Sequence, residues 1–272
     1  MTLTETAYAK INLALHVRKR RVDGYHELET LFAFVDTGDK LTARVADVDR
    51  LSVTGEFASG LANPFDNIVA KAMNALPRSE GLAVNLEKRL PVAAGLGGGS
   101  ADAGAIFRLI RRSYGLPDDW QERAARLGAD VPACVESVTC IGRGTGTELM
   151  PVENDMAGMA VLLVNPRIPM PTGPVFAAWS GQDNGPLVGE TAQEIAVSNA
   201  NDLERIVFET MGVEPAFHVW NELADTNPLL VRMSGSGATI FAIYDDIQGR
   251  DDAAEQIERA HPEWWMMRGA LR

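Results

Sequence analysis

The stretch Pro-Val-Ala-Ala-Gly-Leu-Gly-Gly-Gly-Ser-Ala-Asp-Ala-Gly-Ala at residues 91–105 is the most unusual segment of this 272-residue chain. Four glycines within five positions let a backbone adopt positive φ and approach a ligand without Cβ clashes. A strand-like run at residues 82–87 precedes the stretch, and an apolar stripe of helical spacing follows it. Because loop N–H groups and a helix start would point at one place, the pattern predicts an anion site, with phosphate as its natural ligand.

The alternative for these glycines is a flexible turn or a helix-packing cluster, but a turn needs only one or two of them. Known nucleotide and nucleophile motifs do not fit. A dinucleotide fingerprint G-x-G-x-x-G needs glycine where Ser100 stands, and a Walker-type loop needs a Gly-Lys pair, which the chain lacks. The H-R-D and D-F-G motifs of protein kinases and the G-x-S-x-G elbow of hydrolases are absent as well. We therefore interpret the stretch as a phosphate loop of another design.

Phosphoryl transfer needs a charge clamp on the phosphates, usually a metal, and a group that accepts the proton of the nucleophile. Ser100 is expected to cap the helix after the loop, and its hydroxyl could also hold Mg²⁺ or a phosphate oxygen. Asp102 is expected in the first turn, where a carboxylate suits the helix dipole. Lys10, in the apolar run AYAKINLAL, must face solvent or meet a carboxylate, and Asp130 lies in a tight turn. Each is more readily structural when taken alone, but together they would make a base and the cation that tunes it.

The remaining pattern is of strands followed by helices, which predicts an α+β chain rather than a regular βαβ alternation. Strands are expected at residues 6–17, 28–36, 41–45, 51–53, 82–87, 158–165, 229–233, 239–244 and 264–268. Helices are expected at residues 67–76, 119–127, 201–211, 215–224 and 251–260, besides the one after the glycines. Residues 166–174 and 181–189 are expected to be loops, and a domain boundary is expected within residues 150–156.

Composition limits the partners. Lys and Arg number 25 against 37 Asp and Glu, a net charge of −12, which argues against a nucleic-acid coat or an anionic-membrane binder.

The two cysteines, Cys134 and Cys140, are too few for a disulfide framework and match no zinc spacing, so we expect both to be reduced and buried. The start of the chain lacks the pattern of a secretory signal, and the longest apolar run is too short for a bilayer. A cytoplasmic protein, monomer or homodimer, is expected.

With these pieces assembled, the chain resembles the GHMP kinase superfamily. Its three motifs are present in order, as AKINL (9–13), PVAAGLGGGS (91–100) and MSGSGATIF (233–241). The stretch RVDGYHEL (21–28) is similar to the marker of one subfamily, and further matches are KRLP (88–91), LGADVP (127–132) and IPMPTGPVF (168–176). The resemblance implies two domains, residues 1–152 similar to ribosomal protein S5 domain 2 and residues 153–272 ferredoxin-like.

The resemblance also implies an activity. It is ATP-dependent phosphorylation, with Mg²⁺, of a hydroxyl on a cytidine diphosphate sugar alcohol, in the non-mevalonate route to isoprenoid precursors. Asp130 would be the general base, Lys10 would keep it ionised and steer the hydroxyl, and Ser100 would hold Mg²⁺. The ATP-binding residues would be Pro91, Val92, Ala93, Ala94, Gly95, Leu96, Gly97, Gly98, Gly99, Ser100 and Ala101.

The resemblance implies four substrate-binding residues. Tyr25 would stack on the cytosine, His26 would hydrogen-bond its edge, Asn12 would lie near the transfer point, and Thr172 stands where the subfamily has a substrate-loop threonine. Two departures are Gly104, which costs about 1 kcal/mol of helix propensity relative to Ala, and residues 178–189, which match nothing.

Three alternatives remain. Homoserine, mevalonate or galactose kinases share the glycine loop but should not need the DGYH stretch. A nucleotide-binding sensor without catalysis would not need both Lys10 and Asp130. A dinucleotide-dependent oxidoreductase conflicts with Ser100.

Overall fold

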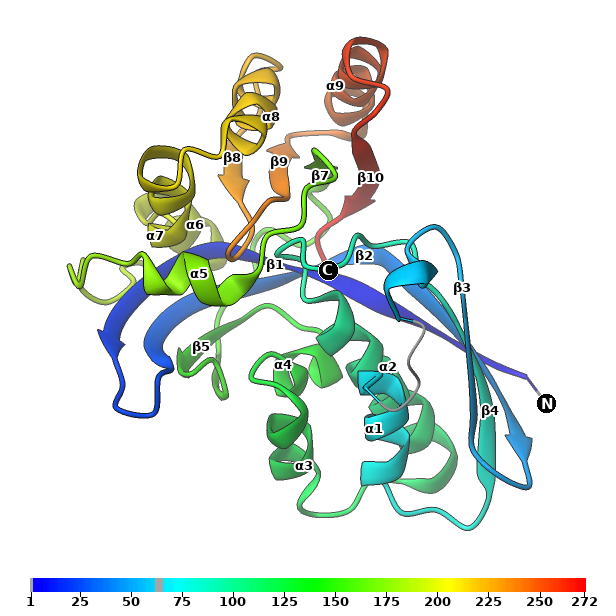
Figure 1. Cartoon of the computed structure of the whole chain (residues 1–272). Coiled ribbons are helices and arrows are strands. Elements are labelled where there is room, and N and C mark those ends of the chain that lie inside the picture. Colours follow the sequence, from blue (N-terminus) through cyan, green and yellow to red (C-terminus); the bar gives the residue numbers. More distant parts are fainter. Residues whose placement is uncertain (1, 62–65) are drawn as a thin grey trace. The chain divides into compact units, whose positions relative to one another are not determined.

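The computed structural model describes residues 2–61 and 66–272. Within them lie a six-stranded mixed sheet, a four-stranded antiparallel sheet and helices, so the α+β prediction is confirmed (Figure 1). The chain forms two compact units, each built from separate segments: unit 1 comprises residues 1–10, 37–92 and 97–137, and unit 2 comprises residues 11–36, 93–96 and 138–272. The expected division of the sequence at residue 152 stays a prediction.

The larger sheet follows the neighbour order β3-β4-β2-β5-β6, and β1 also pairs with β2. Its strands are β1 (Leu3–Arg20), β2 (His26–Ala46), β3 (Arg50–Thr54), β4 (Gly81–Glu87), β5 (Cys140–Gly144) and β6 (Glu148–Pro151). The strands β1 and β2 contribute residues to both units.

One long strand, β2, replaces the two strands predicted at residues 28–36 and 41–45. The prediction was wrong because Gly38 was interpreted as part of a turn. Gly38 instead lets the backbone of β1 approach closely, since a Cβ there would lie 2.0 Å from the carbonyl oxygen of Ala7. The adjacent Asp39 is fully buried, so this polar segment is not a surface turn.

The helices of unit 1 group around α2, which packs against α1, α3 and α4 (Figure 1). They are α1 (Ile68–Ala75), α2 (Gly98–Tyr114), α3 (Trp120–Leu127) and α4 (Val131–Glu136), while the short 3₁₀ helix η1 (Ala58–Leu61) contacts β3 instead. The predicted stripe on α2 is confirmed, with Ile106, Phe107 and Ile110 buried. The predicted helix before the glycine loop is α1, whose first turn is capped by the Asn67 side chain through the N–H of Val69.

Two details of α2 differ from the prediction. The helix begins at Gly98, and its N-cap is Gly97 in the left-handed conformation, so Ser100 is the third helical residue and not the cap. Glycine is suited to this cap because its φ is +60°. Asp102 lies beyond the first turn and is buried, so its carboxylate does not serve the dipole there as predicted.

The smaller sheet belongs to unit 2 and has the order β10-β7-β9-β8. Its strands are β7 (Ala160–Asn165), β8 (Leu230–Met233), β9 (Ile240–Tyr244) and β10 (Trp265–Ala270). The helices α8 (Glu214–Ala224) and α9 (Ile247–Ala260) pack on this sheet and on each other (Figure 1). With α8 before β8 and α9 before β10, the order is the β-α-β-β-α-β pattern of a ferredoxin-like domain.

Further helices of unit 2 lie between β7 and α8 in the sequence: α5 (Thr172–Ala177), α6 (Ala192–Ser198), α7 (Asp202–Arg205) and the π-helical turn η2 (Ile206–Thr210). The predicted loop at residues 166–174 is therefore wrong at its end, where α5 begins. Pro171 precedes this helix and Pro174 is its third residue, where a missing N–H breaks no intrahelical bond.

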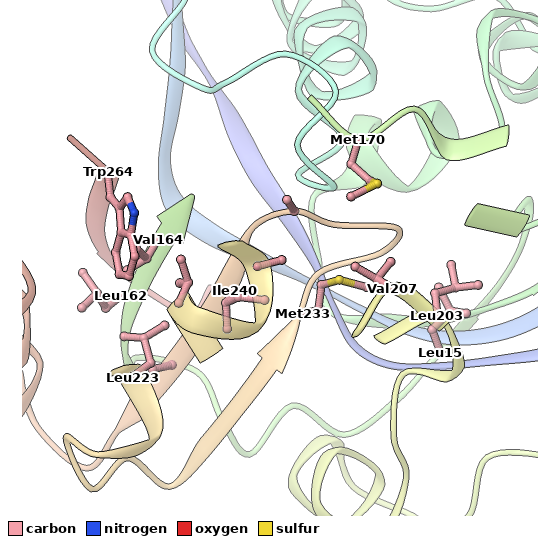
Figure 2. Packing of buried hydrophobic residues seen from close by; sticks show 14 of the residues in the cluster. Leu15, Leu162, Val164, Met170, Leu203, Val207, Leu223, Met233, Ile240 and Trp264 are labelled. Carbon is pink, nitrogen blue, oxygen red and sulfur yellow. The ribbon is translucent and has the colours of Figure 1, made fainter. Parts of the chain in front are cut away.

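The core of unit 2 is a cluster of buried apolar side chains from the sheet and its helices (Figure 2). Leu162 and Val164 of β7 and Ile240 of β9 meet Leu223 of α8, and Leu15 of β1 belongs to the same cluster. Cys134 and Cys140 are buried and form no disulfide, as predicted. No helix within residues 2–61 and 66–272 is both long enough and apolar enough to span a bilayer.

Candidate active site

Lys10 and Asp130 form an ion pair within unit 1. The Lys10 Nζ lies 3.1 Å from Asp130 Oδ2, with 5% of the lysine side chain and 31% of the aspartate side chain exposed. The lysine in its apolar strand therefore meets a carboxylate, one of the two outcomes expected from the sequence. Because the lysine is buried while the carboxylate is partly open, Asp130 is the member of the pair that is more accessible from solvent.

The helix α4 holds Asp130 in place at its N-cap. Its backbone lies directly against α2, since a Cβ on Gly104 would lie 2.5 Å from the carbonyl oxygen of Cys134. Arg108 of α2 donates to that same oxygen at 2.5 Å and to Ser137 Oγ at 2.9 Å, beyond the last residue of α4. The unexplained Gly104 thus lets two helices touch, and this contact positions Asp130.

The start of α2 lies against the ion pair. A Cβ on Gly97 would lie 2.9 Å from Lys10 Cε and 3.8 Å from Asp130 Oδ2. The N–H groups of Gly98, Gly99 and Ser100 belong to the first turn, where the helix itself supplies no acceptor. Glycine at position 97 leaves the room that Lys10 occupies, and the first turn offers donors to a phosphate beside the catalytic candidates.

A second buried cation, Lys88, was not identified by the sequence reasoning. Its Nζ bonds Asp102 Oδ2 at 2.8 Å and also contacts Asp39, and these three side chains are 0–3% exposed. Asp39 further accepts from the backbone N–H groups of Arg89 and Leu90 at 2.5 and 2.8 Å. Two features of the sequence could have indicated this ion pair: a lysine directly after a predicted strand, and a carboxylate just inside the next helix.

The Lys88 triad lies beside the first residue of α2, because a Cβ on Gly98 would lie 3.3 Å from Lys88 Nζ. Burial raises the pKa of Asp102 well above its ordinary value, and the Asp39 charge adds to this, while Lys88 acts in the opposite direction. Burial alone would lower the pKa of Lys88, but the charges of Asp102 and Asp39 outweigh it and raise that pKa. Full ionisation of the triad, with two negative charges against one positive charge, is therefore unfavourable.

The predicted ATP loop is divided, with residues 93–96 in unit 2 and the rest in unit 1. In unit 2 it packs on the third motif. A Cβ on Gly95 would lie 2.1 Å from the carbonyl oxygen of Ser234, whose hydroxyl donates to the Gly95 carbonyl at 2.8 Å. The N–H of Thr239 donates to the carbonyl of Ala94 at 3.2 Å. The glycine at position 95 is therefore needed for contact with the SGSG segment.

Asn12 and Thr172, two of the predicted substrate residues, both adjoin the third motif in unit 2. The Asn12 amide donates to Thr30 Oγ1 at 2.8 Å, and its Oδ1 lies 3.2 Å from where a Gly235 Cβ would be. The Thr172 hydroxyl is 3.2 Å from Ser236 Oγ. The SGSG segment thus brings these two side chains to one part of unit 2.

Tyr25 and His26 differ in exposure. Tyr25 is 64% exposed, which leaves its ring free for stacking, whereas His26 is 9% exposed. The His26 ring packs on Phe176 and Trp179, with centroids 5.2 and 5.8 Å away. Arg20 Nε donates to His26 Nε2 at 3.3 Å, so this nitrogen accepts and the ring proton sits on Nδ1.

Burial, followed by the charge of Arg20, lowers the pKa of His26 from its ordinary 6.5. The ring is therefore neutral at pH 7, with Nδ1–H available as a donor.

The segment at residues 178–189 has no counterpart in the sequence resemblance, yet it is tied to β1 and β2. His16 Nδ1 is 2.9 Å from the carbonyl of Gly185, and Arg18 Nε donates to Asp183 at 2.7 Å. The N–H of Leu187 donates to Glu29 Oε2 at 3.1 Å. It forms neither helix nor strand, so the loop prediction for residues 181–189 is confirmed.

Comparisons with known proteins identify the family of this chain. A model of the GHMP kinase N-terminal domain matches residues 67–138, which include the glycine loop and Asp130. The 4-diphosphocytidyl-2-C-methyl-D-erythritol kinase of Erythrobacter litoralis is 63% identical, over 99% of this chain and 100% of that protein. The enzyme of that name from Novosphingobium aromaticivorans is 64% identical, over 100% of this chain and 94% of that protein.

The chain belongs to the 4-diphosphocytidyl-2-C-methyl-D-erythritol kinase family of GHMP kinases. A crystal structure of a 4-(cytidine 5'-diphospho)-2C-methyl-D-erythritol kinase has a TM-score of 0.81 at 30% identity, covering 99% of both chains. The predicted GHMP kinase fold is therefore confirmed, and the marker RVDGYHEL indicated the right branch of the superfamily.

Proposed function

We propose that the chain transfers the γ-phosphoryl group of ATP to the 2-hydroxyl of 4-(cytidine 5′-diphospho)-2-C-methyl-D-erythritol, a step toward isoprenoid precursors. The observation that carries the proposal is the Lys10–Asp130 ion pair beside the first turn of α2. The pair supplies a proton acceptor and a cation, and the first turn of the helix supplies N–H groups that can donate hydrogen bonds to a phosphate. Identity of 63–64% over nearly the full chain to kinases of this name supports the same substrate.

Asp130 would accept the proton of the attacking hydroxyl as the new P–O bond forms and the bond to ADP breaks. A loose transition state asks little of the base, so its position matters more than its strength. Lys10 would keep Asp130 ionised and draw the hydroxyl oxygen toward the phosphorus. The N–H groups at the start of α2 would stabilise charge on the phosphate oxygens.

Mg²⁺ fits this part of unit 1 through Ser100. Its side chain lies in the first turn of α2, opposite Gly128, where a Cβ would lie 3.8 Å from Ser100 Oγ, so no side chain fills that space. A hydroxyl together with phosphate oxygens is a donor set that suits Mg²⁺. When bound there, the ion would neutralise charge on the phosphates.

Four residues of unit 2 would bind the substrate. The exposed ring of Tyr25 would stack on the cytosine, and His26 Nδ1–H would donate to an acceptor on the edge of the base. Asn12 and Thr172, both beside the SGSG segment, would bind the erythritol phosphate part.

We also propose that the chain divides into two domains at residue 152. The buried, unpaired Cys134 and Cys140 favour a reducing compartment such as the cytoplasm.

The substrate assignment is tested by measuring ADP release with the cytidylylated substrate, homoserine and mevalonate in parallel. We expect turnover with the first alone. Turnover with homoserine or mevalonate and none with the cytidylylated substrate would contradict the proposal.

The catalytic assignment is tested with Asp130→Asn, which should lower kcat by orders of magnitude and leave ATP affinity nearly unchanged. Asp119→Asn is the matched control, because Asp119 is also a helix N-cap in unit 1 but pairs with Arg123 on the surface. Undiminished turnover of Asp130→Asn would remove Asp130 as the base. Intact ATP binding with no turnover in the wild type would favour the sensor alternative.

A further inference from the structure

A group of metal-binding side chains lies on unit 2, outside the residues used above. Among the described residues, His218, Glu222 and His261 each offer a ligand atom, and these atoms all lie within 4.8 Å of one another. His218 Nε2 is 3.4 Å from Glu222 Oε1, and His261 Nε2 is 3.7 Å from Glu222 Oε2. Two imidazoles and one carboxylate therefore face one point.

The elements explain why these side chains meet. His218 and Glu222 stand at i and i+4 on α8, so they share one face of that helix. His261 is the C-cap residue of α9, which packs on α8. Two ligands therefore come from α8 and the third from the end of α9, so the site lies between the two helices.

The distances suit a small transition-metal ion. With bonds of about 2.0–2.1 Å, the ligand atoms around a tetrahedral Zn²⁺ lie about 3.3 Å apart. His218 Nε2 and His261 Nε2 lie 3.4 and 3.7 Å from the two different oxygens of Glu222, close to this edge length, and the three ligand atoms all lie within 4.8 Å of one another. Side-chain rotations that shorten the longer separations would let all three atoms bind one ion, and 53% exposure of the His218 side chain leaves an entry path and room for water.

The surroundings hold His261 in the orientation that binding needs. Its ring stacks on the indole of Trp264, with centroids 3.9 Å apart and planes 11° from parallel. Its other nitrogen, Nδ1, faces Glu263 Oε1 at 3.6 Å. A carboxylate behind a liganding imidazole fixes the ring and raises its basicity at many zinc sites, so Glu263 is placed to support His261 as a ligand.

We propose that His218, Glu222 and His261 form a binding site for a divalent transition-metal ion of the zinc class, with water completing the coordination. The ion would join α8 to α9. Imidazole ligands favour such ions over Mg²⁺, which prefers oxygen donors, so this site is chemically different from the ATP-bound Mg²⁺ proposed above. The inference does not depend on the proposed function.

The test is isothermal titration calorimetry of ZnCl₂ into the full chain, prepared without a polyhistidine tag and treated with a chelator. We expect one saturable zinc site, weakened at least about tenfold by His218→Ala or Glu222→Gln and abolished in the double variant H218A/H261A. Glu255→Gln, an exposed carboxylate on α9 outside the cluster, is the matched control and should bind zinc as the wild type does. MgCl₂ in place of ZnCl₂ should give no saturable heat in this site.

A second measurement guards against misfolded variants. Co²⁺ added to the folded wild type should give the intense visible absorption of a low-symmetry site, and Zn²⁺ should displace it. Zinc should also raise the melting temperature of the wild type and not that of H218A/H261A. Absence of saturable zinc binding below about 1 mM, or undiminished binding by H218A/H261A with a native melting transition, would overturn the proposal.

Discussion

Lys88 is a buried cation whose removal should strongly destabilise the fold. It neutralises Asp39 and Asp102 where none of the three side chains is more than 3% exposed. Breaking a buried ion pair from one side typically costs about 3–5 kcal/mol, because it leaves uncompensated charge. We therefore expect Lys88→Met to lower the free energy of unfolding by about that amount, as measured by urea denaturation.

The same triad predicts a rescue. Asp102→Asn keeps an acceptor for Lys88 and removes the like charge beside Asp39, and burial already raises the pKa of Asp102. Asp102→Asn alone should therefore leave the unfolding free energy unchanged or slightly raised, and K88M/D102N should be more stable than Lys88→Met. Additive losses in the double variant would show that the two carboxylates do not share the Lys88 charge.

His26 predicts a pH dependence with a defined sign. Its pKa is lowered from 6.5 by burial and by Arg20, so the unfolded chain binds this proton more readily than the folded chain. Stability contributed by neutral His26 is then full above pH 6.5 and is lost as pH falls through the window between 6.5 and the folded-state pKa. Protonation also removes the Nε2 acceptor of Arg20, so KM for the cytidylylated substrate should rise in acid while KM for ATP changes less.

Arg20→Met provides the control for this assignment. Without the arginine charge the pKa of His26 should rise, which moves the acid limb of the substrate KM profile to higher pH. An acid limb that stays in place in Arg20→Met would assign it to another group. Loss of the Arg20 bonds to the carbonyls of Ala177 and Trp179 could raise KM at every pH, so the position of the limb is the informative readout.

At the scale of elements, the contact between α2 and α4 decides where Asp130 stands. Gly104→Ala would place a Cβ 2.5 Å from a backbone oxygen of α4, and a backbone cannot rotate away. We expect a loss of about 1–3 kcal/mol from overpacking, partly offset by about 1 kcal/mol of helix propensity. Because Asp130 moves with α4, kcat should fall by at least about tenfold, since a displacement near 1 Å can cost about 100-fold.

Gly249→Ala is the matched control for that prediction. Gly249 is also helical, but a Cβ there would have its nearest neighbour at 3.5 Å, an ordinary contact. We expect a gain of up to about 1 kcal/mol and unchanged kcat. Equal effects of the two substitutions in chemical denaturation and in kcat would show that the α2–α4 approach does not position Asp130.

The elements also show what the sequence can predict. The apolar stripe of α2 and the alternation of β4 were predictable because each buries one face at a fixed period. The length of β2 was not predictable, because Gly38 and Asp39 are typical turn residues in the local sequence. The residues that they contact in the strand, Ala7 and Lys88, are distant in sequence.

The candidate site divides in the same way. The Lys10–Asp130 pair was expected from residue types, but the role of Gly104 depends on a helix, α4, that local pattern did not indicate. The Lys88 triad was missed because its three members lie on β2, after β4 and on α2, and no local period links them.

At the scale of the whole molecule, a net charge of −12 must coexist with two polyanionic substrates. Lys10 and the start of α2 act at close range, whereas the overall charge acts at long range and is screened more strongly by salt. The Debye length falls from about 30 Å at 0.01 M to about 8 Å at 0.15 M ionic strength.

We therefore expect kcat/KM for both substrates to rise, by roughly two- to threefold, as KCl is added over this range at constant MgCl₂, because screening weakens long-range repulsion more than the local contacts. Initial rates at subsaturating substrate measure the effect, and choline chloride in place of KCl separates screening from specific binding of K⁺. A steep fall in kcat/KM with either salt would mean that a positive field around the site outweighs the net charge and steers the substrates in.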